Sequence, residues 1–214
     1  MQIRDLEIFV VGNPPPGFGG RYFTFVKLTT DDGIVGYGEA YNASVRPKAT
    51  SSAARAAELV AQGFTALKFD PAGPYTRFGP HQPDMAILER SEAFCRKVRE
   101  AVGDKADLLF GTHGQFTVSG AKRLARRIEP YDPLWFEEPI SPEMPERMAE
   151  VAASTKVPIA TGERLTTKWE FARVLRSGAA NILQMNLGRV GGLLEAKKIA
   201  GVAEVYAAQI APHL

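Results

Sequence analysis

The hydrophobic positions of this chain fall into short runs that end in polar residues. The most distinctive run, Leu134-Trp135-Phe136, is followed by Glu137-Glu138-Pro139. Short apolar runs of this kind predict buried parallel strands, and the segments between them are long enough for one helix each. We therefore predict six strand–helix steps between residues 64 and 213. The other five runs end at Asp70, His113, Glu163, Asn186 and His213.

The first part of the chain follows a different pattern, which predicts a small antiparallel sheet. Alternating runs cover residues 3–11, 22–28 and 34–38, and Asp31-Asp32-Gly33 is a turn signal between the last two. Residues 14–20 are rich in proline and glycine and predict an irregular loop, acting either as part of a structural cap or as a lid over a site.

The change of pattern at Thr50 divides the chain into two predicted domains. Residues 1–50 are expected to form part of an N-terminal capping domain, and residues 51–214 part of a (β/α) barrel. A barrel is favoured over an open doubly wound sheet because polar residues end many successive strands, whose ends surround one site in a barrel. The turn at residues 188–192 could bind phosphate, as in a phosphate-dependent barrel enzyme, but a tight strand–helix turn is favoured.

Composition narrows the class of protein without identifying it. The chain has 214 residues, of which 45% are hydrophobic and 23% charged, with a net charge of +2. Its acids and bases are interspersed, so neither nucleic acid nor a membrane surface is an expected partner. The single cysteine, Cys95, lies in a helical pattern and is predicted to be a small side chain of the protein core and not a nucleophile. We find no signal peptide or membrane span in the printed sequence and expect a cytoplasmic location.

The strand ends carry candidate chemistry. Side chains alternate along a strand, so Glu137 and Glu163 can point to the same interior from neighbouring strands. Two carboxylates this close need a cation beside them, and their hard oxygen ligands suit Mg²⁺. The spacing of Glu137 and Glu163 is explained equally well if both are structural acids held in salt bridges. Lys68 and His213 stand on either side of them in strand order, as two acid/base groups acting on one substrate would.

Several motifs, in this order along nearly the whole chain, resemble the enolase superfamily. The similarity is greatest to the mandelate racemase/muconate lactonizing enzyme branch and, within it, to the sugar-acid dehydratases. The motifs are Gly36-Tyr37-Gly38-Glu39, Lys68-Phe69-Asp70, Trp135-Phe136-Glu137-Glu138-Pro139, Thr161-Gly162-Glu163-Arg164, Gly188-Arg189-Val190-Gly191-Gly192 and Pro212-His213.

The resemblance implies a modified (β/α)₇β barrel of the TIM type under an α+β cap. It also implies Mg²⁺ held by acids at three successive strand ends, and a reaction that begins with abstraction of the proton α to a carboxylate. Glu137 and Glu163 would be metal ligands, and Lys68 and His213 would be base and acid. We further expect a substrate, an acid sugar, to contact Glu138, Arg164 and Gln184, and the protein to be a homo-oligomer.

The sequence departs from the family pattern at two site positions. Gly111 stands where the resemblance places an Asp ligand, and His113 could serve as third ligand or as the acid that protonates a leaving hydroxyl; an incomplete metal site is the alternative. Asn186 replaces the Asp that orients the histidine. An amide can accept a hydrogen bond from His213 but cannot stabilise imidazolium by charge, so Lys68, helped by Asp70, is the stronger candidate base.

The chain is also short for this family. A complete barrel has about 250 residues, so we expect an internal block near Thr50 and a C-terminal segment to be missing from the printed sequence. The predicted function is Mg²⁺-dependent dehydration of an aldonate or aldarate. A sugar-acid cycloisomerase or epimerase and a non-catalytic sugar-acid-binding relative remain the alternatives.

Overall fold

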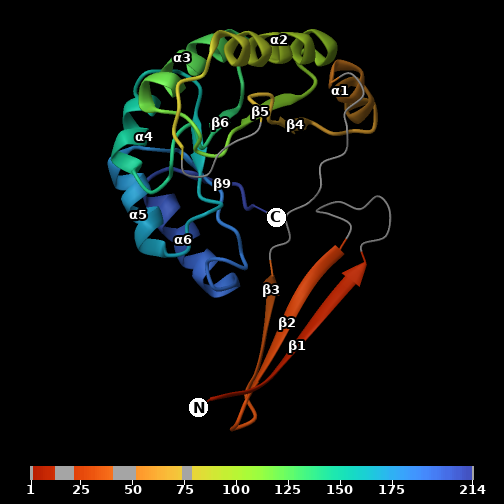
Figure 1. The fold of residues 1–214 in the computed structure, drawn as a ribbon, viewed down its shortest axis with the longest axis vertical. Coiled ribbons are helices and arrows are strands. Elements are labelled where there is room, and N and C mark those ends of the chain that lie inside the picture. The colour runs from red at the N-terminus through yellow and green to blue at the C-terminus, as the bar shows by residue number, and fades with distance from the viewer. Residues whose placement is uncertain (1, 13–21, 41–51, 74–78, 214) are drawn as a thin grey trace.

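The computed structural model describes the chain except for residues 1, 13–21, 41–51, 74–78 and 214. It contains a three-stranded sheet and a six-stranded sheet flanked by helices (Figure 1). The strands are β1 (Ile3–Gly12), β2 (Tyr22–Thr30), β3 (Val35–Ala40), β4 (Ala66–Phe69), β5 (Asp107–Gly111), β6 (Trp135–Glu137), β7 (Ile159–Thr161), β8 (Ile182–Leu183) and β9 (Gln209–Ile210). The helices are α1 (Ser52–Ala61), α2 (Met85–Val102), α3 (Val118–Ile128), the short 3₁₀ turn η1 (Glu129–Tyr131), α4 (Pro145–Ala152), α5 (Lys168–Ser177) and α6 (Leu193–Val205).

The three N-terminal strands form the antiparallel meander that the sequence predicts. β1 pairs with β2 and β2 with β3, and the turn between the last two strands contains Gly33 at a φ of 83°. This sheet extends away from the parallel sheet (Figure 1). The proline- and glycine-rich loop at residues 14–20 lies outside the described residues, and the capping role of residues 1–50 stays a prediction.

The six later strands form one parallel sheet in the order β4-β5-β6-β7-β8-β9. The sheet curves into an arc with the helices along its outer side (Figure 1). Sequential order with a helix between successive strands is the topology of a TIM-type barrel. The predicted (β/α) barrel, incomplete in this chain, is therefore confirmed.

Local sequence signals account for several of the helix boundaries. Asp84 caps α2 by accepting a hydrogen bond from the backbone N–H of Ile87 at 2.7 Å. Thr167 and Glu170 form a capping box at the start of α5, and Gly178 ends that helix in the left-handed conformation. Such caps fix where these helices begin and end.

The core lies between the helices and the convex face of the parallel sheet. Its largest fully buried side chains include Phe110, Phe136 and Phe171. Gly162, which follows β7, is packed against this core with a φ of 137°, and a Cβ there would lie 2.7 Å from the Phe171 ring. A glycine is therefore required at 162, where the chain turns to present Glu163.

Candidate active site

The parallel pairing brings the polar strand ends of the sequence to one edge of the sheet. Gly111 at the end of β5 lies opposite Glu137 at the end of β6. Beyond β8 and β9, an isolated bridge joins Asn186 to His213. The carboxyl ends of barrel strands are where the sites of TIM-barrel enzymes form, so these residues define the candidate active site.

Glu137 is at the centre of this edge, and its side chain is fully buried. One oxygen, Oε1, lies 2.6 Å from the Lys68 ammonium. The other, Oε2, accepts hydrogen bonds from Trp135 Nε1 at 3.2 Å and from Gln184 Nε2 at 2.7 Å. A buried carboxylate needs such compensation, and here three nitrogen donors provide it.

Lys68 reaches Glu137 from two strands away. It belongs to β4, whereas Glu137 belongs to β6, and β5 lies between them. The lysine stem passes over Gly111, where an added Cβ would lie 3.5 Å from Lys68 Cε and 3.2 Å from the carbonyl oxygen of Phe69. A Cβ at 111 would therefore meet the lysine stem in ordinary van der Waals contact, which places Gly111 directly beside the Lys68–Glu137 ion pair.

Asp70 and His113 form a pair at the β4 side of the site. Oδ2 of the aspartate lies 3.1 Å from Nδ1 of the histidine. Burial disfavours the charged imidazole, but the hydrogen bond and charge of Asp70, together with the charges of Glu163 and Glu137, outweigh it and raise the pKa of His113. This arrangement favours a protonated His113 that could act as an acid.

His213 and Glu163 form a similar pair at the other side of the site. Nε2 of the histidine lies 3.2 Å from Oε2 of Glu163. Burial lowers the pKa of His213, and the positive charges of Lys68 and Arg189 add to that effect while Glu163 and Glu137 oppose it. The two histidines therefore have opposite pKa shifts.

Asn186 contacts the second ring nitrogen of His213, with Nδ2 lying 3.1 Å from Nδ1. Its oxygen is already used as the acceptor for the backbone N–H of Arg189 at 3.0 Å. The sequence suggested that Asn186 accepts from the imidazole, but in this structure the amide donates instead. Nδ1 of His213 is then an acceptor, which places the proton of the neutral ring on Nε2, facing Glu163.

Glu138 and Arg164 form an ion pair that is largely internal. Nε and Nη2 of Arg164 lie 3.2 and 3.1 Å from Oε2 of Glu138, whose side chain is fully buried. Burial raises the pKa of the Glu138 carboxyl to about 7; the Arg164 charge opposes this, and Glu163 and Glu137 add to it. Substrate contacts by Glu138, Arg164 and Gln184 stay a prediction.

Three residues support the site without having been selected from the sequence. The buried Thr112 hydroxyl lies 2.6 and 2.7 Å from the carbonyl oxygens of Glu137 and Glu138, and Gln115 Oε1 accepts the backbone N–H of His113. Trp135 donates to Glu137, and strand alternation could have predicted that contact because the two residues share a face. The other two contacts depend on loop geometry that has no sequence signal.

The site does not fit a closed Mg²⁺ centre. In the part of the chain that the structure describes, no three His, Cys, Asp or Glu side chains gather closely enough to hold a metal ion. Glu137 and Glu163 offer oxygen ligands of the right type, but Glu137 is satisfied by nitrogen donors and Glu163 contacts His213. The third position of the expected set is Gly111, which has no donor.

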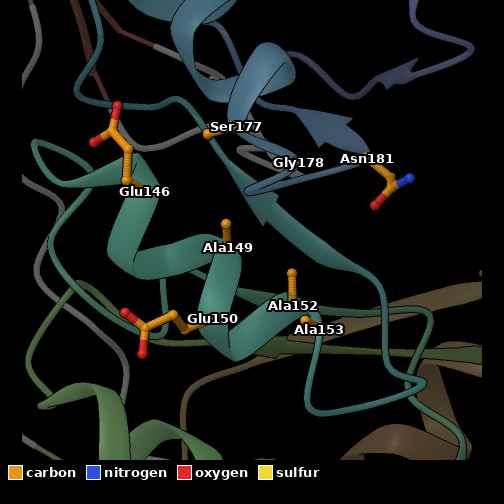
Figure 2. Close-up of a pocket in the computed structure, with 8 residues that line it drawn as sticks. All are labelled: Glu146, Ala149, Glu150, Ala152, Ala153, Ser177, Gly178 and Asn181. Atoms are coloured by element: carbon orange, nitrogen blue, oxygen red, sulfur yellow. The ribbon is translucent and has the colours of Figure 1, made fainter.

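A surface hollow elsewhere has no comparable chemistry. It lies along α4 and extends to the chain between α5 and β8, near Asn181 (Figure 2). Most of its lining is alanine, serine and glycine, and Asn181 precedes β8, so that part of the hollow is at the opposite end of the sheet from the site.

None of the helices that the structure describes is long and apolar enough to cross a membrane.

Comparison with known proteins identifies the family. Residues 51–214 match the model of the enolase C-terminal domain-like family. A solved structure from Labrenzia alexandrii DFL-11 is 51% identical, with a TM-score of 0.84 over all of this chain and 82% of that one. The mandelate racemase/muconate lactonizing enzyme from Sulfitobacter sp. is 45% identical, with a TM-score of 0.84 over all of this chain and 78% of that one.

The chain therefore belongs to the enolase superfamily, in its mandelate racemase/muconate lactonizing enzyme branch. It is also 39% identical to the D-galactonate dehydratase of Ralstonia nicotianae (strain ATCC BAA-1114 / GMI1000) over 166 residues. That match covers 74% of this chain but only 42% of the dehydratase. The chain thus spans less than half the length of this curated relative.

Proposed function

We propose that this chain forms the catalytic part of a sugar-acid dehydratase, which removes the proton α to a carboxylate and expels the β-hydroxyl as water. Membership of the superfamily and the similarity to a protein named D-galactonate dehydratase support this proposal. The observation that carries it is the arrangement of two imidazole–carboxylate pairs, one on each side of Lys68 and Glu137.

The two pairs suit the two proton transfers of a dehydration. In the pair of His213 and Glu163, the carboxylate accepts the Nε2 proton of the ring, and Nε2 then takes the proton from the α-carbon as that C–H bond breaks. His113, oriented by Asp70, gives a proton to the β-hydroxyl, and water leaves as the C–O bond breaks. The resulting enol becomes a 2-keto-3-deoxy acid by tautomerisation. General acid and base groups placed in this way typically contribute a factor of about 10²–10⁴ each.

Lys68 has a different role in this proposal from the one that the sequence favoured. The sequence makes it the stronger candidate base, but its ammonium lies 2.6 Å from Glu137 and is engaged there in an ion pair. Its side chain is 43% exposed, so the ammonium also stays accessible to an acidic ligand. We therefore assign proton abstraction to His213 and carboxylate binding to Lys68.

Magnesium dependence was part of the sequence prediction, and superfamily members typically bind Mg²⁺. When bound, such an ion stabilises the negative charge that develops on the substrate carboxylate. Because Gly111 leaves the donor set incomplete, no step of the proposed reaction is assigned to a metal.

Turnover of a panel of aldonates and aldarates tests the proposal, with keto-acid formation followed by carbonyl derivatisation and the products identified by NMR. The three histidines of the chain provide a matched set. His113→Asn and His213→Asn are expected to lose about 10²-fold or more in turnover, whereas His81→Asn, outside the site, keeps it. No turnover by the unaltered chain across the panel, with or without Mg²⁺, would count against catalysis.

A non-catalytic acid-binding protein is the second candidate, and Gly111 together with Asn186 favours it. Calorimetric binding of an acid sugar without turnover would support this candidate. A product with the elements of water retained would instead indicate a cycloisomerase or epimerase. We also propose that the protein is a homo-oligomer. Light scattering of the purified protein tests this by giving the mass of the assembly.

A further inference from the structure

The strongest unexplained feature of the site is the position of the Lys68 ammonium. In this family a cation is expected between the carboxylates at the strand ends. Here one already lies 2.6 Å from Glu137 Oε1, and it comes from the chain itself. A fully buried carboxylate is costly unless a charge of opposite sign is close, so whatever cation lies beside Glu137 is part of the folded structure.

The geometry around Gly111 explains how the lysine reaches that position. Lys68 must cross β5 to contact Glu137, and its Cε lies 3.5 Å from where a Cβ of residue 111 would be. A Cβ there would be in ordinary van der Waals contact with the lysine stem. The glycine therefore removes one oxygen ligand and places no side-chain atoms beside the stem of Lys68.

We propose that the Lys68 ammonium is the resident cation of this site, holding the Glu137 carboxylate where superfamily members hold a metal ion. Gly111, which supplies no ligand of its own, lies beside the lysine stem. Trp135 and Gln184 complete the set of donors to Glu137, so the carboxylate is satisfied by protein groups alone. The inference does not depend on catalysis: it applies equally to an active dehydratase and to a non-catalytic relative.

Replacement of the lysine tests the inference by stability, measured as thermal unfolding with MgCl₂ or with EDTA. The unaltered chain is expected to unfold at the same temperature in both. Lys68→Met leaves Glu137 buried without a cation, so its unfolding temperature falls and added Mg²⁺ restores much of the loss. Lys168→Met is the matched control, since Lys168 pairs with Glu195 on the surface at 3.1 Å; its small loss is not restored by Mg²⁺.

Restoring the carboxylate tests the same inference in the opposite direction. Gly111→Asp is expected to displace Lys68 and to create a site that binds one Mg²⁺ per chain, measured by calorimetric titration. Gly111→Ala adds the Cβ without a ligand and is expected to bind none. If Lys68→Met does not fold, the double variant Lys68→Met/Glu137→Gln is expected to fold, because the buried charge is then removed together with its partner.

Two results would overturn the inference. One is binding of one Mg²⁺ per unaltered chain with a rise in unfolding temperature, because the lysine would then not occupy the cation position. The other is an equal response of Lys68→Met and Lys168→Met to Mg²⁺. Neither result concerns turnover, so failure of this inference is distinguishable from failure of the proposed dehydratase.

Discussion

Glu138 gives the most sharply defined prediction on stability. Its carboxylate is fully buried beside Arg164, and burial raises its pKa from an ordinary value of 4.5 to about 7. Between those values the folded protein keeps a proton that the unfolded chain has lost. Stability from this group is therefore complete below 4.5, and it is lost as the pH rises through about 7.

The size of the effect follows from the shift. One pKa unit corresponds to about 1.4 kcal/mol, so the rise corresponds to on the order of 3 kcal/mol of unfolding free energy, lost between about pH 4.5 and about pH 8. Glu138→Gln removes the titration while it keeps the shape. The amide oxygen can accept from Arg164, and the amide nitrogen can donate to the Thr161 hydroxyl, which lies 3.4 Å from Glu138 Oε1.

Urea unfolding of the unaltered chain and of Glu138→Gln at about pH 5 and about pH 8, in EDTA, measures this contribution. Between the two pH values the unaltered chain is expected to lose more unfolding free energy than the variant does, by up to on the order of 3 kcal/mol. Glu100→Gln, on the exposed side of α2, is the control and is expected to behave like the unaltered chain. The reasoning is refuted if Glu138→Gln shows the same pH dependence as the unaltered chain.

Three further changes test the structure around the site and in the core. Thr112→Val removes a hydroxyl that lies within hydrogen-bond distance of two backbone carbonyls and donates its one hydrogen there. It is expected to cost about 1 kcal/mol in urea unfolding; no loss would contradict these contacts. Thr167→Ala breaks the capping box with Glu170 and is expected to cost about 1 kcal/mol, whereas Thr167→Ser keeps most of it. Cys95 is fully buried and burial raises its pKa to about 12, so a thiol reagent should label it only after denaturation; rapid native labelling would contradict its burial.

The sequence predicts the architecture well because hydrophobic period and capping chemistry are local properties. All six parallel strands lie within the short apolar runs, and the three antiparallel strands overlap the segments of alternating apolar and polar residues. The boundaries are less accurate. Helix α4, for example, begins at Pro145, where proline occupies the first turn and needs no N–H partner.

The strand ends were predicted as a set, and so was a contact of Asn186 with His213, but the other pairings were not. Period and topology show that Lys68, His113, Glu137, Glu163 and His213 share one edge of the sheet. The pairing of Asp70 with His113 and the donation from Asn186 to His213 depend on side-chain positions across neighbouring strands. Such contacts have no periodic signal along the chain, so only the folded structure defines them.

Gly111 shows why a departure from a family motif has to be interpreted in three dimensions. From the sequence alone, a glycine at a ligand position indicates only a missing carboxylate and a weaker metal site. In the structure the same glycine lies beneath the stem of Lys68 and opposite Glu137 in the strand register. Both the loss of a negative charge at 111 and the arrival of a positive charge beside Glu137 make the site more positive, as a bound metal ion would. An unpaired buried carboxylate would destabilise the fold, so the ammonium gives the buried Glu137 a partner even though one metal ligand is absent.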